Sequence, residues 1–187
     1  MSAAFIVDGL TEKKIIQRLC PGSPIRTTGM NGKDVALKAI AKAANSLIKL
    51  FRGRYYPIVI IVDREGRAQS AIDIERDLTR LLVELGAVEN ELIVCSPDRM
   101  IENWMLADTK YLFEIYDVQA PTPCEGLHGK QTLKRLLATK NISYHETTVG
   151  VDILSNCDPH AISERAESFQ RLMERAQFFC RWLRATP

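Results

Sequence analysis

Short apolar runs separated by polar and helical segments form the main pattern along this chain. Residues 58–62 are five consecutive β-branched residues, a run typical of a strand that is covered on both faces in a parallel sheet. Residues 4–7 and 92–95 are two further apolar runs, and residues 24–27 allow another short strand. The pattern therefore predicts several buried strands.

Apolar residues recur at helical spacing between these runs. The spacing predicts helices over 13–20, from Asp34 to Phe51, and from Ser70 to Gly86, with Asp34 and Ser70 as N-caps. Strands that alternate with helices require crossover connections. We therefore predict an α/β fold, with a central, mostly parallel sheet flanked by helices.

The last third of the chain is chiefly helical. A break at residues 121–123, Pro-Thr-Pro, precedes this region, and Asp158 followed by proline is typical of a helix start. An apolar stripe from Phe169 to Leu183 predicts a final helix that also includes Cys180. We expect an α/β domain over residues 1–120 and a helical C-terminal extension over 121–187, packed on the same core.

Acidic residues follow two of the predicted strands. Asp63 and Glu65 come directly after residues 58–62, and their carboxylates point the same way if the chain stays extended. Asp8 follows the first strand, and Glu12 lies shortly after it, beyond the candidate N-cap Thr11. Because parallel strands end at the same sheet edge, these acids are expected to meet there. The alternatives are an ordinary polar turn for the pair and a helix-capping charge for Glu12.

Two segments further along the chain could contribute to the same edge. Glu102 would begin a helix after the strand at 92–95, either as a metal-binding or water-positioning acid or as a charge that offsets the helix dipole. Lys130, in the sequence His128-Gly129-Lys130, could contact a phosphate or be a solvated lysine. Converging carboxylates repel one another, and a hard divalent cation such as Mg²⁺ or Mn²⁺ relieves that repulsion.

Three stretches resemble a known family. Residues 7–13, Val-Asp-Gly-Leu-Thr-Glu-Lys, and residues 62–65, Val-Asp-Arg-Glu, resemble motifs of the Toprim domain of topoisomerases, primases and OLD-type nucleases. Asp8 stands where that family has glutamate, and Glu65 stands where it has a second aspartate. Residues 101–108 are similar to a segment of small stand-alone Toprim-like proteins, which are often encoded beside ATPases in prokaryotic defence loci.

The resemblance implies Mg²⁺- or Mn²⁺-dependent hydrolysis of phosphodiester bonds in DNA or RNA. Asp8, Asp63 and Glu65 would hold the metal, and Glu12 or Glu102 would act as general base. A different possibility is a non-enzymatic Toprim-like subunit that regulates or senses for a partner ATPase. A hydrolase of small phosphate esters is a third possibility, but no phosphate-loop or nucleophile motif supports it.

Composition agrees with one globular domain but does not select a partner. The chain has 187 residues, of which 46% are hydrophobic and 26% charged, and its formal net charge of +2 neither requires nor excludes nucleic acid. A homo-oligomer also stays open. No apolar run approaches the ~20 residues that span a bilayer, and no signal peptide is evident, so we expect a cytoplasmic protein without a membrane partner. The five cysteines are scattered, and we expect them to be reduced.

Overall fold

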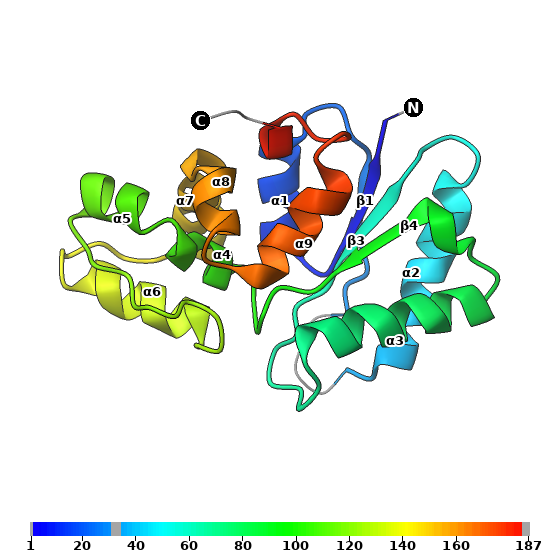
Figure 1. Ribbon diagram of the computed structural model, residues 1–187, viewed down its shortest axis with the longest axis horizontal. Helices are drawn as coiled ribbons and strands as arrows, with labels where there is room; N and C mark the ends of the chain where they lie inside the picture. The colour runs from blue at the N-terminus through cyan, green and yellow to red at the C-terminus, as the bar shows by residue number, and fades with distance from the viewer. Residues whose placement is uncertain (1, 31–34, 185–187) are drawn as a thin grey trace.

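A parallel sheet forms the centre of the protein. The computed structural model describes residues 2–30 and 35–184. Within these residues the sheet has four parallel strands in the order β2-β1-β3-β4 (Figure 1). The strands are β1 (Ala4–Val7), β2 (Ile25–Thr27), β3 (Ile58–Ile61) and β4 (Leu92–Cys95). The predicted α/β fold with a parallel central sheet is confirmed.

Helices cover both faces of the sheet. Helices α2 (Leu37–Phe51) and α3 (Ala71–Glu84) lie on one face, where Ile6 and Ile60 are buried beneath them. Helices α1 (Leu10–Leu19) and α9 (Glu167–Ala176) lie on the other (Figure 1). Side chains of a strand alternate between its faces, so both faces need apolar residues. This requirement explains the uninterrupted apolar runs in the sequence.

Most of the chain after β4 packs beside α1 and α9. It contains the helices α4 (Glu102–Ala107), α5 (Thr109–Tyr116), α6 (Gly129–Ala138), α7 (Val151–Asn156) and α8 (Pro159–Ser163), a π-helical turn at Glu146–Gly150 and a 3₁₀ turn at Trp182–Arg184; another 3₁₀ turn, Glu89–Glu91, precedes β4. Trp104 joins this region to α9, because its ring lies 5.1 Å from that of Phe169 and its Nε1 donates to Ser168 Oγ at 2.9 Å. The division at residue 120 stays a prediction.

The strand connections diverge between β1 and β3. The chain leaves β1 through α1 on one face of the sheet to reach β2, and leaves β3 through α3 on the opposite face to reach β4. Such a point leaves a crevice outside the carboxyl ends of the two strands, where open α/β sheets bind their ligands. Asp8 and Asp63 follow these two strands.

Several helix ends differ from the sequence-based expectation. Ser70 is the predicted N-cap of α3, and its Oγ accepts from Asp73 N at 3.1 Å. For α1, however, Gly9 is the N-cap and Thr11 lies inside the first turn. The expected N-cap Asp34 lies outside the described residues. The last long helix ends at Ala176, so the apolar stripe continued beyond the helix.

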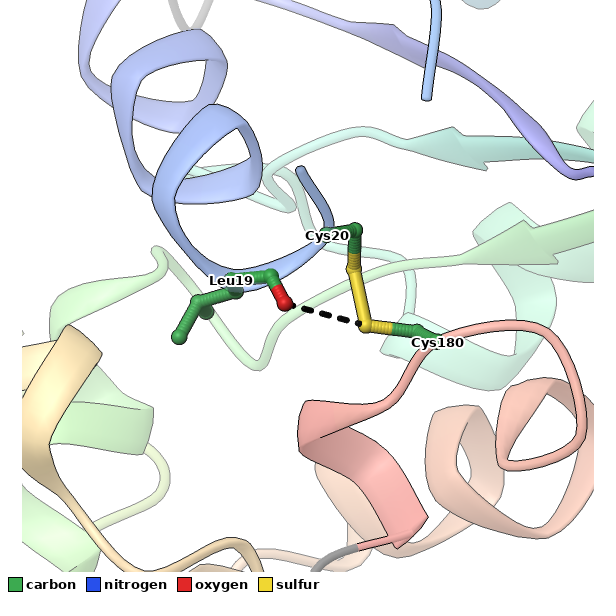
Figure 2. Close-up of a disulfide and its surroundings, with 3 residues drawn as sticks. All are labelled: Leu19, Cys20 and Cys180. Atoms are coloured by element: carbon green, nitrogen blue, oxygen red, sulfur yellow. Dashed lines mark hydrogen bonds between the residues drawn. A yellow bond between two sulfur atoms is a disulfide. The ribbon is translucent and has the colours of Figure 1, made fainter. Parts of the chain in front are cut away.

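The expectation that all five cysteines are reduced is wrong for one pair. Cys20, at the end of α1, forms a disulfide with Cys180, which follows α9 (Figure 2). Their Cα atoms lie 5.4 Å apart although 160 residues separate them in the sequence, so sequence spacing held no signal for the pairing. The other cysteines are free and buried: Cys95, Cys124 and Cys157.

Across residues 2–30 and 35–184, no helix combines the length and apolar character that crossing a bilayer requires.

Candidate active site

A cavity of about 580 Å³ opens at the point where the strand connections diverge. Its walls come from the ends of β1 and β3 and from the first turns of α1, α4 and α6. All five acids singled out in the sequence line it: Asp8, Glu12, Asp63, Glu65 and Glu102. The structure thus brings together acids that lie up to 94 positions apart, since residue 102 minus residue 8 is 94.

Asp8 ties the ends of three strands together. Its side chain is buried, and Oδ2 accepts a hydrogen bond from the backbone N–H of Asp63 at 3.2 Å. Oδ1 accepts from the hydroxyl of Thr28, just after β2, at 3.3 Å. Burial raises the pKa of Asp8 to about 7, although these two hydrogen bonds oppose the rise. Asp8 therefore has a structural role in addition to its place in the cavity.

Asp63 presents a buried oxygen that no donor satisfies. Its Oδ1 is buried and has no hydrogen-bond partner among the described residues. Burial raises the pKa of Asp63 well above its usual value, and the neighbouring carboxylates of Glu12 and Asp8 raise it further. A buried carboxylate oxygen without a donor is unusual in folded proteins, and a missing ligand is one explanation for it.

Glu65 reaches the cavity by a turn rather than by strand alternation. The strand ends at Ile61, and Glu65 has a left-handed backbone with φ of 58°. Its N–H donates to the carbonyl of Arg99, which is also left-handed with φ of 69°, at 2.6 Å. The chain does not stay extended past residue 62, so the condition for parallel carboxylates at Asp63 and Glu65 is not met. A non-glycine residue in this region of backbone space is strained, and such strain is concentrated at functional sites.

Glu12 both caps its helix and faces the cavity. Its Oε2 accepts from the N–H of Gly9 at 3.1 Å, which satisfies a donor at the start of α1. Burial raises the pKa of Glu12, and the nearby carboxylates of Glu146 and Glu65 add to the rise. The two roles considered for Glu12 from the sequence are therefore compatible.

Glu102 is held by a tyrosine from a distant segment. It begins α4 as predicted, is 4% exposed, and its Oε1 accepts from the hydroxyl of Tyr144 at 3.1 Å. Burial raises the pKa of Glu102 to about 7. Gly150 permits this arrangement, because a Cβ at that position would lie 2.6 Å from the Tyr144 hydroxyl oxygen.

Three further residues line the cavity beside these acids. Lys130 forms an ion pair with Glu146, and His128 has a buried Nδ1 without a hydrogen-bond partner among the described residues. Close packing at Gly129 holds this part of the lining in place, because a Cβ there would lie 2.8 Å from the backbone nitrogen of Asn103. Sequence reasoning gave no role to His128 or Glu146, since only the fold brings them to the cavity.

The carboxylate oxygens of the cavity suit a hard cation, but their arrangement does not form a coordination shell. Carboxylate oxygens are the ligands that Mg²⁺ and Mn²⁺ prefer, and the unsatisfied Oδ1 of Asp63 is one such donor. Among the described residues, however, no three His, Cys, Asp or Glu side chains are grouped so that they could hold a metal ion.

The fold and the cavity define an α/β protein with an acidic site at the divergence point of a parallel sheet. Residues 7–176 match the family described as "Domain of unknown function (DUF4276)", and the chain belongs to that family. No curated protein and no solved structure matches it.

Proposed function

We propose that this protein is a divalent-metal-dependent nuclease that hydrolyses phosphodiester bonds in nucleic acid. The observation that carries the proposal is the buried, unsatisfied Oδ1 of Asp63 in a cavity lined by four further predicted acids. The resemblance of residues 7–13 and 62–65 to Toprim motifs supports the same chemistry. So does the position of the cavity, where open α/β sheets bind ligands.

In this proposal, Asp8, Asp63 and Glu65 would hold Mg²⁺ or Mn²⁺. Such an ion, when bound, stabilises negative charge on the phosphate and makes water more acidic. Glu102 has a pKa of about 7, so it can take a proton from water near neutral pH. The Tyr144 hydroxyl donates to Oε1 of Glu102 and holds that oxygen in place. The other carboxylate oxygen, Oε2, would then accept the proton from water. Glu12 is the second possible base.

Lys130 is a cationic group in the cavity that could position a phosphate. The ammonium group of Lys130 lies beside Glu146, and His128 is its neighbour in the lining. An incoming phosphate would compete with Glu146 for Lys130, because both are anions at hydrogen-bond range. Lys130 would thereby orient the substrate, and the acids would face its reacting bond.

A second candidate function is regulation of a partner ATPase without catalysis. One observation favours it: both oxygens of Asp8 already accept hydrogen bonds, from Asp63 and Thr28. These bonds give Asp8 a structural use that does not depend on a metal ion. The two functions differ in whether purified protein alone breaks nucleic acid.

The proposal also includes a cytoplasmic location, with nucleic acid as substrate and an ATPase as possible partner. The Cys20–Cys180 disulfide argues against a cytoplasmic location, because stable disulfides are rare in the reducing cytosol of mesophiles. Thiol labelling in intact cells, followed by mass spectrometry of residues 20 and 180, separates the oxidised from the reduced form.

A cleavage assay tests the nuclease function. Labelled single- and double-stranded DNA and RNA are incubated with the protein in Mg²⁺, Mn²⁺ or EDTA. The wild-type protein is expected to cut the nucleic acid in Mg²⁺ or Mn²⁺. No scission is expected in EDTA or with the Asp63→Asn variant. Asp117→Asn is the matched control, because Asp117 has a left-handed backbone that asparagine tolerates and does not line the cavity.

The outcomes separate the two candidate functions. Scission that persists in Asp63→Asn would point to a contaminant or to another site. Absence of scission under every metal, together with stable association with a partner ATPase, would support the regulatory function instead.

A further inference from the structure

A second, cationic groove lies at the far end of α1. It has a volume of about 820 Å³, and the arginines Arg18, Arg181 and Arg184 line it. Helix α1 has 10 residues, which span about 15 Å at the usual rise per residue, and Glu12 of the acidic cavity lies in its first turn. The groove and the acidic cavity therefore occupy opposite ends of this helix. We call it the arginine groove.

The charge in the arginine groove is largely uncompensated. Arg18 pairs with Asp152, but no carboxylate among the described residues pairs with Arg181 or Arg184. Within residues 2–30 and 35–184, no acidic residue lines the groove. Guanidinium groups that converge without acids attract anions and bind phosphate with paired hydrogen bonds.

A buried hydroxyl in the groove also lacks a partner. Ser155 Oγ is buried and makes no hydrogen bond to any residue in the described part of the chain, and Ser155 lines the groove. A hydroxyl group can donate to a phosphate oxygen. Three arginines and one free hydroxyl are a set of donors that matches a phosphate group.

The disulfide holds the two sides of the groove together. Cys20 lies between the lining residues Leu19 and Pro21, and Cys180 directly precedes Arg181 (Figure 2). Cys180 Sγ also lies 3.7 Å from the carbonyl oxygen of Leu19. Because a disulfide sulfur has no proton, this is a close polar contact and the covalent bond is the main restraint.

We propose that the arginine groove binds a phosphate group of a nucleotide or of a nucleic-acid backbone, and that the Cys20–Cys180 bond is required because it holds Arg181 and Arg184 in place. A dithiol reductant supplies two electrons and two protons, converts the bond to two thiols and becomes a disulfide itself. The segment after α9 is then no longer tied to α1. Phosphate binding falls when the bond is reduced.

Binding measurements with defined probes test this proposal. Inorganic phosphate, ATP and a short single-stranded oligonucleotide are titrated calorimetrically into the oxidised protein, in EDTA to prevent cleavage. The double variant Arg181→Ala/Arg184→Ala should bind at least about tenfold more weakly. Arg76→Ala/Arg80→Ala is the matched control, because it removes the same charge from exposed positions on α3.

The redox requirement is tested on the same probes. Reduction is verified by a rise in free thiols from three to five. Reduced wild type and Cys20→Ser should both lose affinity about tenfold or more. If Cys20→Ser does not fold, reduced wild type with an unchanged circular dichroism spectrum decides the question.

Each result supports or overturns the proposal. Preference for ATP identifies a nucleotide as the source of the phosphate, and salt-sensitive binding of the oligonucleotide alone identifies a nucleic-acid backbone. No binding of any probe, equal affinity of the two double variants, or unchanged affinity after reduction overturns it. This proposal is tested by loss of probe binding in Arg181→Ala/Arg184→Ala in EDTA, whereas the proposed nuclease function is tested by metal-dependent scission, so failure of one is distinguishable from failure of the other.

Discussion

Replacing Glu102 by glutamine removes a buried charge while keeping the shape of the side chain. Glu102 is 4% exposed and its Oε1 accepts from Tyr144, a hydrogen bond that the amide oxygen of glutamine can also accept. The metal-free protein must hold this carboxylate among other acids. We therefore expect Glu102→Gln to stabilise the metal-free protein at alkaline pH.

The size of the effect follows from the raised pKa. The Glu102 carboxyl loses its proton near 4.5 in an unfolded chain and at about 7 in the folded protein. The contribution of this group to the free energy of unfolding is therefore complete below pH 4.5. It falls as pH rises from about 4.5 to about 7, because the folded state holds the proton more tightly than the unfolded chain. At about 1.4 kcal/mol per pH unit, the difference amounts to about 3 kcal/mol at most.

Urea unfolding in EDTA measures the difference directly. At about pH 8.5 Glu102→Gln should exceed wild type by up to about 3 kcal/mol, and at about pH 5 the gap should shrink to about 1 kcal/mol or less. The exposed control Glu164→Gln should stay within about 0.5 kcal/mol of wild type at both values. A gap that does not change with pH, or a variant less stable than wild type at alkaline pH, would refute the reasoning.

Three other substitutions test contacts around Glu102 and Trp104. Tyr144→Phe removes a donor that lowers the pKa of Glu102, so the acidic limb of a pH–activity profile should move to higher pH. Gly150→Ala should cause a similar shift and also destabilise the protein by about 1–3 kcal/mol in urea unfolding, since its Cβ would meet the Tyr144 hydroxyl. Ser168→Ala should lower the free energy of unfolding by about 1–3 kcal/mol, measured the same way, because the buried Nε1 of Trp104 loses its acceptor.

The fold could be predicted from the sequence because its strands are buried on both faces. Uninterrupted apolar runs at 4–7, 58–62 and 92–95 contain β1, β3 and β4, although β3 ends at Ile61, and the α/β class follows from their alternation with helices. Helix ends were harder to predict. The N-terminus of α1 is capped by a hydrogen bond from the Gly9 N–H to the Glu12 carboxylate. Such a contact does not appear as a periodic pattern in the sequence, whereas apolar spacing does.

The acids at the strand ends could be found in the sequence because parallel strands end at one sheet edge. Asp8 and Asp63 follow adjacent strands, and Glu102 follows β4. His128 and Glu146 could not be found in this way, because they follow no strand and reach the cavity only through packing after β4. The Cys20–Cys180 disulfide could not be predicted from the sequence either, because the two cysteines lie 160 residues apart and their spacing matches no motif.

The most direct test of the account is a calorimetric titration of Mn²⁺ into the metal-free protein at about pH 8, which lies above the pKa of about 7 of Asp8 and Glu102. Wild type and Asp117→Asn should bind Mn²⁺ and release protons on binding, while Asp63→Asn and Glu65→Gln should bind it at least about tenfold more weakly. Equal binding by all four proteins, or no binding by wild type, would contradict the assignment of this cavity as a metal-dependent active site.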